Sequence, residues 1–166
     1  MANTKTARSR LGYLLALASG ALAAGTIAPA GASGGSGGHS TDCEREFEAA
    51  QRQDMESFRD YDVESFRAIH HEDAVTIFAS GRVVQGADEI ITALRRHFEE
   101  RQAVWSWTEL LRQVHGCRTA YILYDTTYFR PSDGAFQHAV VGVTYTREHS
   151  QWLAIADQGT LLPSDP

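Results

Sequence analysis

The chain has 166 residues, of which 43% are hydrophobic and 22% charged, and this composition is ordinary for a globular protein with one domain. After position 32 there are 12 basic and 21 acidic residues, so the formal charge of that part is 12 − 21 = −9. A surface this acidic repels phosphate backbones and anionic lipid headgroups, which argues against nucleic acids and membrane surfaces as partners.

Residues 1–32 have the layout of a secretory signal peptide. Lys5 and two arginines precede the apolar run 11–27, which is rich in Leu and Ala, and A-x-A cleavage motifs follow within 28–32. Serine and glycine interrupt the apolar run, so a permanent membrane span is the weaker interpretation. We therefore predict an exported protein that is not held in a membrane after the signal peptide is removed.

Residues 33–42 are rich in Gly and Ser and predict a flexible leader, and residues 43–163 form the predicted domain. Its two cysteines are Cys43 and Cys117. An even number of cysteines in an exported chain favours a disulfide, which would contribute about 4 kcal/mol in the chain-entropy model. Two unrelated thiols, one of them buried, are the alternative.

Helical periodicity predicts three helices at the start of this domain. Residues 42–60 carry apolar side chains at three- and four-residue steps on one face. Asp62 caps a second short helix that ends at Ala68, and a third helix covers 87–101.

Between and after these helices, the sequence reads as β-structure. Two short strands flank the turn Ser80-Gly81, and Pro131 to Gly134 is a strong hairpin signal. The predicted strands are 74–78, 82–85, 103–114, 118–130, 135–146 and 151–158. This order predicts an α+β fold in which three N-terminal helices pack on one curved, mostly antiparallel sheet, and the concave side of such a sheet can hold a ligand.

Four short motifs carry a resemblance to a known family: Tyr61-Asp62, Glu72 to Val75, Gly81 with Gly86 to Ile90, and Thr144 to Arg147 followed by Trp152 to Gly159. In this order and spacing, over nearly all of 43–163, the chain resembles the nuclear-transport-factor-2-like superfamily, which includes ketosteroid isomerases and SnoaL-like polyketide cyclases. The resemblance implies a cone-shaped fold with one pocket and, often, a homodimer. It says little about chemistry.

The catalytic residues of the ketosteroid isomerases do not carry over. The resemblance places their general base at Phe78, their oxyanion-hole tyrosine at Asp54 and their oxyanion-hole acid near Val141. Proton transfer beside a ketone needs a base on one side and hydrogen-bond donors on the other. Steroid isomerisation is therefore disfavoured, and Phe78 is expected to shape an apolar pocket.

Asp54 is the first candidate catalytic residue. It lies in the apolar stripe of the first predicted helix, where a carboxyl is costly unless it is paired or protonated. It either projects into the cone as an acid or base with a raised pKa, or pairs with an arginine or water at the edge of the stripe. His138 is the second candidate. It would form a proton-transfer couple with Asp54 or Asp125 if it faced the pocket, and would otherwise be a half-exposed strand residue.

Aromatic residues on the predicted strands are candidates for ligand contact. Tyr124 and Tyr128 share one face of their strand, and Trp107 belongs to the preceding strand. Such residues are more often plain core, although in a cone part of the core is the pocket wall. No motif implies a cofactor. The adjacent His70 and His71 do not predict a metal site, because neighbouring residues on a strand point to opposite faces, and we expect them instead to end the second helix.

Three functions are compatible with these residues. The first is an exported enzyme acting on a small molecule through Asp54 and His138. The second is a binding module that holds an apolar ligand without converting it, and the third is an association domain that dimerises through its open sheet face. The sequence does not decide whether the protein is an enzyme.

Overall fold

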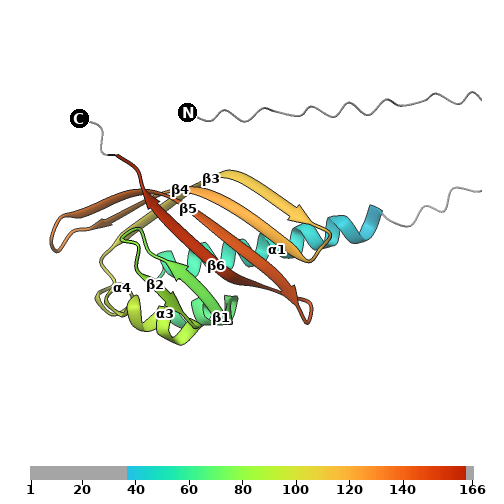
Figure 1. Ribbon diagram of the computed structural model, residues 1–166, viewed down its shortest axis with the longest axis horizontal. Coiled ribbons are helices and arrows are strands. Elements are labelled where there is room, and N and C mark those ends of the chain that lie inside the picture. The colour runs from blue at the N-terminus through green and yellow to red at the C-terminus, as the bar shows by residue number, and fades with distance from the viewer. Residues whose placement is uncertain (1–36, 164–166) are drawn as a thin grey trace, which may run out of the picture. The chain divides into compact units, whose positions relative to one another are not determined.

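The computed structural model describes residues 37–163 (Figure 1). The predicted signal peptide and the start of the predicted leader lie outside them. The helices are α1 (Gly37–Arg59), α2 (Val63–Ile69), α3 (Ala87–Ala93) and α4 (Arg95–Glu100). The strands are β1 (His70–Ile77), β2 (Val83–Gln85), β3 (Val104–His115), β4 (Thr119–Arg130), β5 (Ala135–Glu148) and β6 (Gln151–Leu161). Within the described part of the chain, no helix has the length and apolarity needed to cross a membrane.

The six strands form one curved, open sheet in the order β2-β1-β6-β5-β4-β3. All neighbours pair antiparallel except β1 and β6, which are parallel. The long α1 runs along one side of β3 to β6, and α3 and α4 lie at the end of the sheet near β2 (Figure 1). The predicted α+β fold with helices on a curved, mostly antiparallel sheet is confirmed.

Two helix boundaries differ from the prediction. Helix α1 begins at Gly37 rather than at Asp42, so part of the predicted leader is helical. Once a helix exists, each further residue adds a hydrogen bond, so α1 continues through glycines that would not start a helix. The predicted third helix is two helices, α3 and α4, which meet at Leu94 (φ −92°, ψ 4°). This break turns His97 inward, where only 5% of it is exposed.

The sheet face that α1 covers, the inner face, is fully packed at one end and partly exposed at the other. At the end that carries Cys43 and Cys117, the inner side chains of β4 and β5 are buried, Ile122 and Val143 among them. Towards α4, the inner-face Tyr128 and Val141 are only half-buried. We call these the disulfide end and the α4 end.

The apolar core is divided between two clusters. One cluster joins α1 to β4, β5 and β6 around Phe47 and Tyr145, and the other joins α2, β1 and α3 around Phe66 and Ile90. Buried polar side chains, among them Asp54, His70 and Thr76, belong to neither cluster. Burying polar groups is costly. Their burial beside the core therefore indicates that this part of the interior has a role in addition to packing.

Cys43 and Cys117 form a disulfide, with their Cα atoms 5.7 Å apart. The bond joins α1 to the turn between β3 and β4 and spans 74 residues of sequence. The predicted pairing is confirmed.

Candidate functional site

The periodicity of α1 places Asp54 on the helix face that meets the sheet, and only 2% of Asp54 is exposed. The hydroxyl of Tyr145 on β5 donates a hydrogen bond to Asp54 Oδ2 over 2.5 Å. Burial raises the pKa of Asp54, against the opposing effects of the His70 charge and the Tyr145 hydrogen bond. Asp54 therefore points inward, as its functional interpretation required, and its partner is a phenol rather than an arginine.

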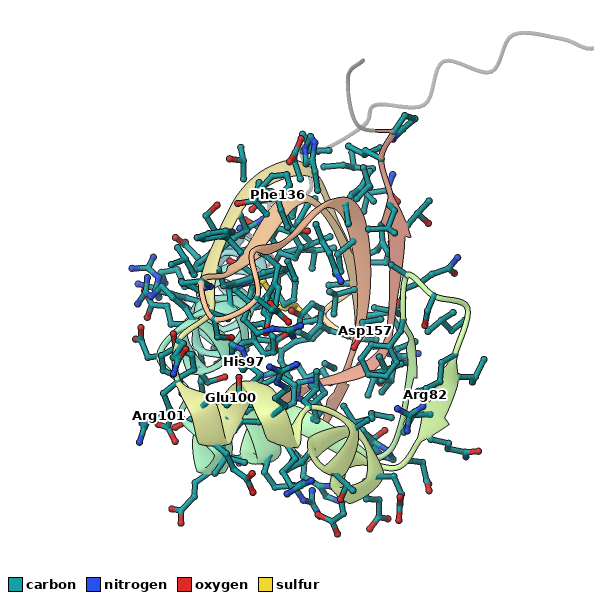
Figure 2. The ribbon with its side chains drawn as sticks, turned by 90° about the vertical axis from the view of Figure 1, so that its left-hand side faces the viewer. Arg82, His97, Glu100, Arg101, Phe136 and Asp157 are labelled. Carbon is teal, nitrogen blue, oxygen red and sulfur yellow. A yellow bond between two sulfur atoms is a disulfide. The ribbon has the colours of Figure 1, made fainter. Side chains whose placement is uncertain are left out.

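A second interior carboxyl, Asp157, was not singled out from the sequence. It lies on β6, paired with Thr76 of β1, whose Oγ1 donates a hydrogen bond to Asp157 Oδ2 over 2.8 Å. Burial raises the pKa of Asp157 to about 6, and the charge of Asp54 adds to this rise. Asp157 nevertheless stays partly exposed, and Figure 2 shows its side chain on the inner side of β6. The surroundings of this carboxyl are mostly protein, but part of the side chain remains accessible. Such a carboxyl is suited to proton transfer near neutral pH.

The position of Asp157 follows from an irregularity in the sheet. Tyr145 pairs with Ala154 and Thr144 pairs with Ala156, so β6 has one extra residue, Ile155, between these pairs. A bulge of this kind reverses which side chains face inward. Strict alternation from the buried Ala154 would have sent Asp157 outward, and the bulge sends it inward.

His70 lies near both carboxyls. It is the first residue of β1 and is buried, and its Nδ1 donates a hydrogen bond to the carbonyl of Phe66 over 2.7 Å. When protonated, its charge lowers the pKa of both Asp54 and Asp157. The neighbouring His71 lies instead beside Glu148, 3.4 Å away.

Tyr124, a predicted ligand contact, is fully buried at 0% exposure on the inner face of β4. Its hydroxyl has no hydrogen-bond partner within the described residues. Burial raises its pKa, and the charge of Asp54 adds to the rise, whereas side-chain hydrogen bonding with Gln51 and Tyr145, looser than a well-aligned hydrogen bond, lowers it. Tyr124 therefore belongs to a buried polar group that also includes Asp54, Gln51 and Tyr145.

Aromatic rings form the interior wall towards α4. Phe58, one helical turn after Asp54, stacks on His97 with ring centroids 3.8 Å apart and meets Trp105 edge to face at 5.2 Å. Tyr128, another predicted contact, lies 6.4 Å from Phe58 between ring centroids. The inner wall towards α4 is therefore aromatic.

The other two predicted ligand contacts lie at the margins of this interior. Phe78 follows β1 at the hairpin into β2, with the guanidinium of Arg82 5.9 Å from its ring centre. Trp107 is half-buried on β3, with the guanidinium of Arg59 5.5 Å from its ring centre. Nothing in the described contacts joins either ring to the two interior carboxyls.

His138 does not meet Asp54. The inner residues of β5 include Val141, Val143 and Tyr145, and strand alternation therefore places His138 on the opposite, outer face. There its Nε2 lies 2.8 Å from Asp125 Oδ1, and both side chains are more than a third exposed. The expected His138–Asp125 pair exists, but the sheet separates it from the interior site.

The outer face carries a groove of about 320 Å³ that the helices do not cover. Its lining comes from four strands and combines apolar residues such as Val75, Leu123 and Val140 with polar ones, among them Asp157 and Gln158. Gly142 lies beneath Tyr121, and a Cβ at this glycine would fall 2.5 Å from the Tyr121 hydroxyl. Among the residues described, no group of three or more His, Cys, Asp or Glu side chains is placed to hold a metal ion.

No family model and no curated protein sequence matches the chain. Solved structures do match. An NTF2-like protein with a cystatin-like fold from Novosphingobium aromaticivorans is 16% identical, with a TM-score of 0.64 over 76% of this chain and 86% of that one. A domain of unknown function with a cystatin-like fold from Nostoc punctiforme is 17% identical, with a TM-score of 0.63 over 75% and 80%.

A ketosteroid isomerase-like protein from Erwinia carotovora atroseptica is 15% identical, with a TM-score of 0.59 over 72% of this chain and 96% of that one. Identities this low establish the fold and leave the chemistry to the site itself. The described part of the chain therefore has the nuclear-transport-factor-2-like fold, in common with ketosteroid isomerase-like proteins of similar size.

Proposed function

We propose that this is an exported small-molecule pocket protein that catalyses proton transfer with its two interior carboxyls, Asp54 and Asp157. The observation that carries the proposal is the pair itself. The two groups come from α1 and β6, burial raises the pKa of both, and the charge of Asp54 raises that of Asp157 further. A fold gains no stability from burying two such groups.

The two carboxyls differ in a way that suits an acid and a base. Asp54 is almost fully enclosed, and burial raises its pKa although the hydrogen bond that Tyr145 donates favours the ionised form. Asp157 has a pKa of about 6 and stays partly exposed, so near neutral pH it is largely ionised and can accept a proton from a ligand. Groups whose environments separate their roles in this way are the usual components of general acid–base catalysis.

The disulfide and the predicted signal peptide support export, because disulfides persist in oxidising compartments. The fold supports a pocket, and the aromatic wall around Phe58 supports an apolar ligand. Steroid isomerisation stays disfavoured, because the position of that base holds Phe78. The proposed base is instead on β6.

A generic carbon acid tests the proposed base without knowledge of the natural substrate. In the ring opening of nitrobenzisoxazole, a base removes the ring C–H proton, that electron pair forms the nitrile, and the N–O bond breaks to release a coloured phenolate. We expect the protein to accelerate this elimination, with a rate that rises through about pH 6 as Asp157 ionises. Asp157→Asn should lower the rate about 100-fold or more.

Asp125→Asn is the matched control, because it makes the same change on the outer face beside His138. It should keep the full rate. An elimination no faster than in acetate buffer, or a rate that survives Asp157→Asn, would contradict the proposal.

We also propose that the protein forms a homodimer through its outer sheet face. The uncovered groove between Val75 and Val140 supports this, as do large apolar side chains such as Phe129 and Phe136, which are 40% and 62% exposed. Uncovered apolar patches of this kind are common interaction surfaces.

A further inference from the structure

We propose that two copies of this chain interlock through a twofold contact, in which Phe129 and Phe136 of each copy lie over Leu123 and Gly142 of the other. This inference rests on the proposed homodimer, because it states which parts of the two outer faces meet. Three features of the outer face carry it: its lack of charge, two apolar rows across it, and the distance between those rows.

The outer face is nearly free of charge, although the domain is acidic. Its outward-pointing residues on β4 and β5 are every second residue from Thr119 to Phe129 and from Phe136 to Thr146. Among these described positions Asp125 is the only carboxylate, and none is an arginine or lysine. Asp125 is itself paired with His138 of the same copy at 2.8 Å. Depletion of charge is typical of the centre of a protein interface.

This charge pattern favours a second copy as the partner. After position 32 the chain carries a formal charge of 12 − 21 = −9, so two copies repel each other wherever that charge is exposed. The outer face of β4 and β5 contributes almost nothing to this repulsion. Two copies therefore approach each other at the lowest electrostatic cost through this face.

The first apolar row crosses the outer face beside the β4–β5 turn. Phe129 and Phe136 pair directly across the two strands and are 40% and 62% exposed. Val104 of β3 pairs with Phe129 and is 60% exposed. Figure 2 shows Phe136 on the side of the sheet away from α4. Large apolar side chains that are exposed together mark a surface that a partner covers.

The second apolar row forms a hollow further along the same strands. Leu123 and Gly142 pair with each other, and both line the groove of about 320 Å³. Because Gly142 has no side chain, the ring of Tyr121 lies over it, with the hydroxyl 2.5 Å from the position that a Cβ would take. The floor of the groove therefore offers a leucine and an aromatic ring. Aromatic side chains of a partner pack favourably on such a floor.

The spacing of the two rows is the same on both strands. Phe129 lies six residues after Leu123, and Gly142 lies six residues after Phe136. Six residues of strand span about 20 Å, so the rings of one copy cannot reach its own groove. A twofold axis across the strands, midway between the rows, places the rings of each copy over the groove of the other. Both contacts then form together, because in a twofold interface each contact occurs twice.

Cysteine cross-linking tests this register. The two native cysteines are joined to each other, so introduced cysteines supply the free thiols. A short bis-maleimide should join two copies of the double variant Leu123→Cys with Phe129→Cys, and denaturing gel electrophoresis measures the covalent dimer. Neither single variant should be cross-linked, because position 129 faces position 123 of the other copy and neither position faces itself. Leu123→Cys with Val63→Cys, whose second thiol is on α2, is the control and should give no covalent dimer.

Phe136→Ser tests the contribution of the rings to association. Phe136 is 62% exposed in the single copy, so its loss leaves the core intact. Because each dimer buries this ring twice, the dissociation constant of the dimer should rise about 100-fold in sedimentation experiments. Val63→Ser, at an exposed valine of α2, is the control and should leave the dissociation constant unchanged.

The possible failures are distinguishable. If Phe129→Cys alone is cross-linked, the rows of rings meet each other, and this register is wrong while the homodimer stands. A wild-type dimer that neither weakens with Phe136→Ser nor gives a covalent dimer in the double variant also overturns the register alone. A wild-type protein that is a monomer at high concentration overturns the homodimer and the register together.

Discussion

At the scale of single residues, the contact between Tyr145 and Asp54 holds the proposed acid in place. The phenol oxygen and Asp54 Oδ2 are 2.5 Å apart, and both side chains are buried. A hydrogen bond to a charged or partly charged group in this setting is short and strong. The contact fixes the carboxyl of α1 against β5.

Replacing this phenol tests its role. Tyr145→Phe removes the donor and leaves a buried carboxyl oxygen without it, which should lower the free energy of unfolding by about 1–3 kcal/mol. It should also raise the pKa of Asp54 further, because the lost hydrogen bond opposes the effect of burial. Urea denaturation measures the first effect. Tyr121→Phe on the outer face is the control. If it lowers the free energy of unfolding as much as Tyr145→Phe does, the hydrogen bond to Asp54 adds no stability beyond that of an ordinary tyrosine hydroxyl.

At the scale of elements, His97 attaches α4 to α1. Its Nε2 donates to the carbonyl of Phe58 over 2.7 Å while its ring stacks on the Phe58 ring. Its Nδ1 is buried and has no hydrogen-bond partner among the described residues. Burial lowers the pKa of His97 below 6.5, so the folded protein holds this ring in its neutral form.

The lowered pKa of His97 predicts an acid-sensitive attachment of α4. The unfolded chain binds the proton more readily than the folded one, so the stability from His97 is present above pH 6.5 and is lost as pH falls through 6.5 towards the folded pKa. Asp157 acts in the opposite sense, because its pKa is raised to about 6. Because the two residues have opposite effects on the pH dependence of stability, the contribution of His97 is measured by comparing a His97 variant with the wild-type protein.

His97→Gln should flatten the loss of unfolding free energy between about pH 7 and pH 5, relative to the wild-type protein. His115→Gln, an exposed change at the end of β3, should leave that loss as it is. Parallel curves for wild type and His97→Gln, from urea denaturation at several pH values, would show that His97 carries no such dependence.

The disulfide links two elements that are distant in the sequence, at the packed end of the sheet. It spans 74 residues between α1 and the β3–β4 turn. The double change Cys43→Ser with Cys117→Ser should lower the free energy of unfolding by about 4 kcal/mol, through the larger freedom of the unfolded chain. Denaturation of the oxidised wild-type protein beside the variant measures the difference. An unchanged midpoint would mean that the bond adds no stability.

At the scale of the whole molecule, the proposed dimer places the outer groove between two copies. Leu123→Arg puts a charge into that groove and should convert a dimer to a monomer in light scattering. Leu110→Arg is a matched change at an exposed leucine of β3 that does not line the groove. A wild-type protein that is already monomeric at high concentration would contradict the proposed self-association.

Much of the molecule could be predicted from the sequence, because its signals are local. Turn residues such as Gly81 and Gly134 both have positive φ and separate strands at the expected places. The helical periodicity of α1 was enough to place Asp54 on the face that packs against the sheet. The disulfide followed from the number of cysteines and the predicted export.

The features that could not be predicted depend on how the strands pair, and no local sequence pattern indicates that pairing. The extra residue Ile155 in β6 turns Asp157 inward, and alternation alone would have turned it outward. For His138 the signal was available, since the apolar Val141, Val143 and Tyr145 mark the inner face and exclude it. The tyrosine partner of Asp54 lies 91 positions along the chain, beyond the reach of any motif.

The most direct test of the account is the titration of the Asp157 carboxyl. Carbon-13 NMR of the aspartate carboxyl carbons follows each group through pH, and comparison with the spectrum of Asp157→Asn assigns the signal that disappears. We expect a midpoint at about pH 6 for Asp157. A midpoint near 3.8, the ordinary value for an aspartate, would mean that Asp157 is not a base with a raised pKa, and the proposed proton transfer would lose the residue that accepts the proton.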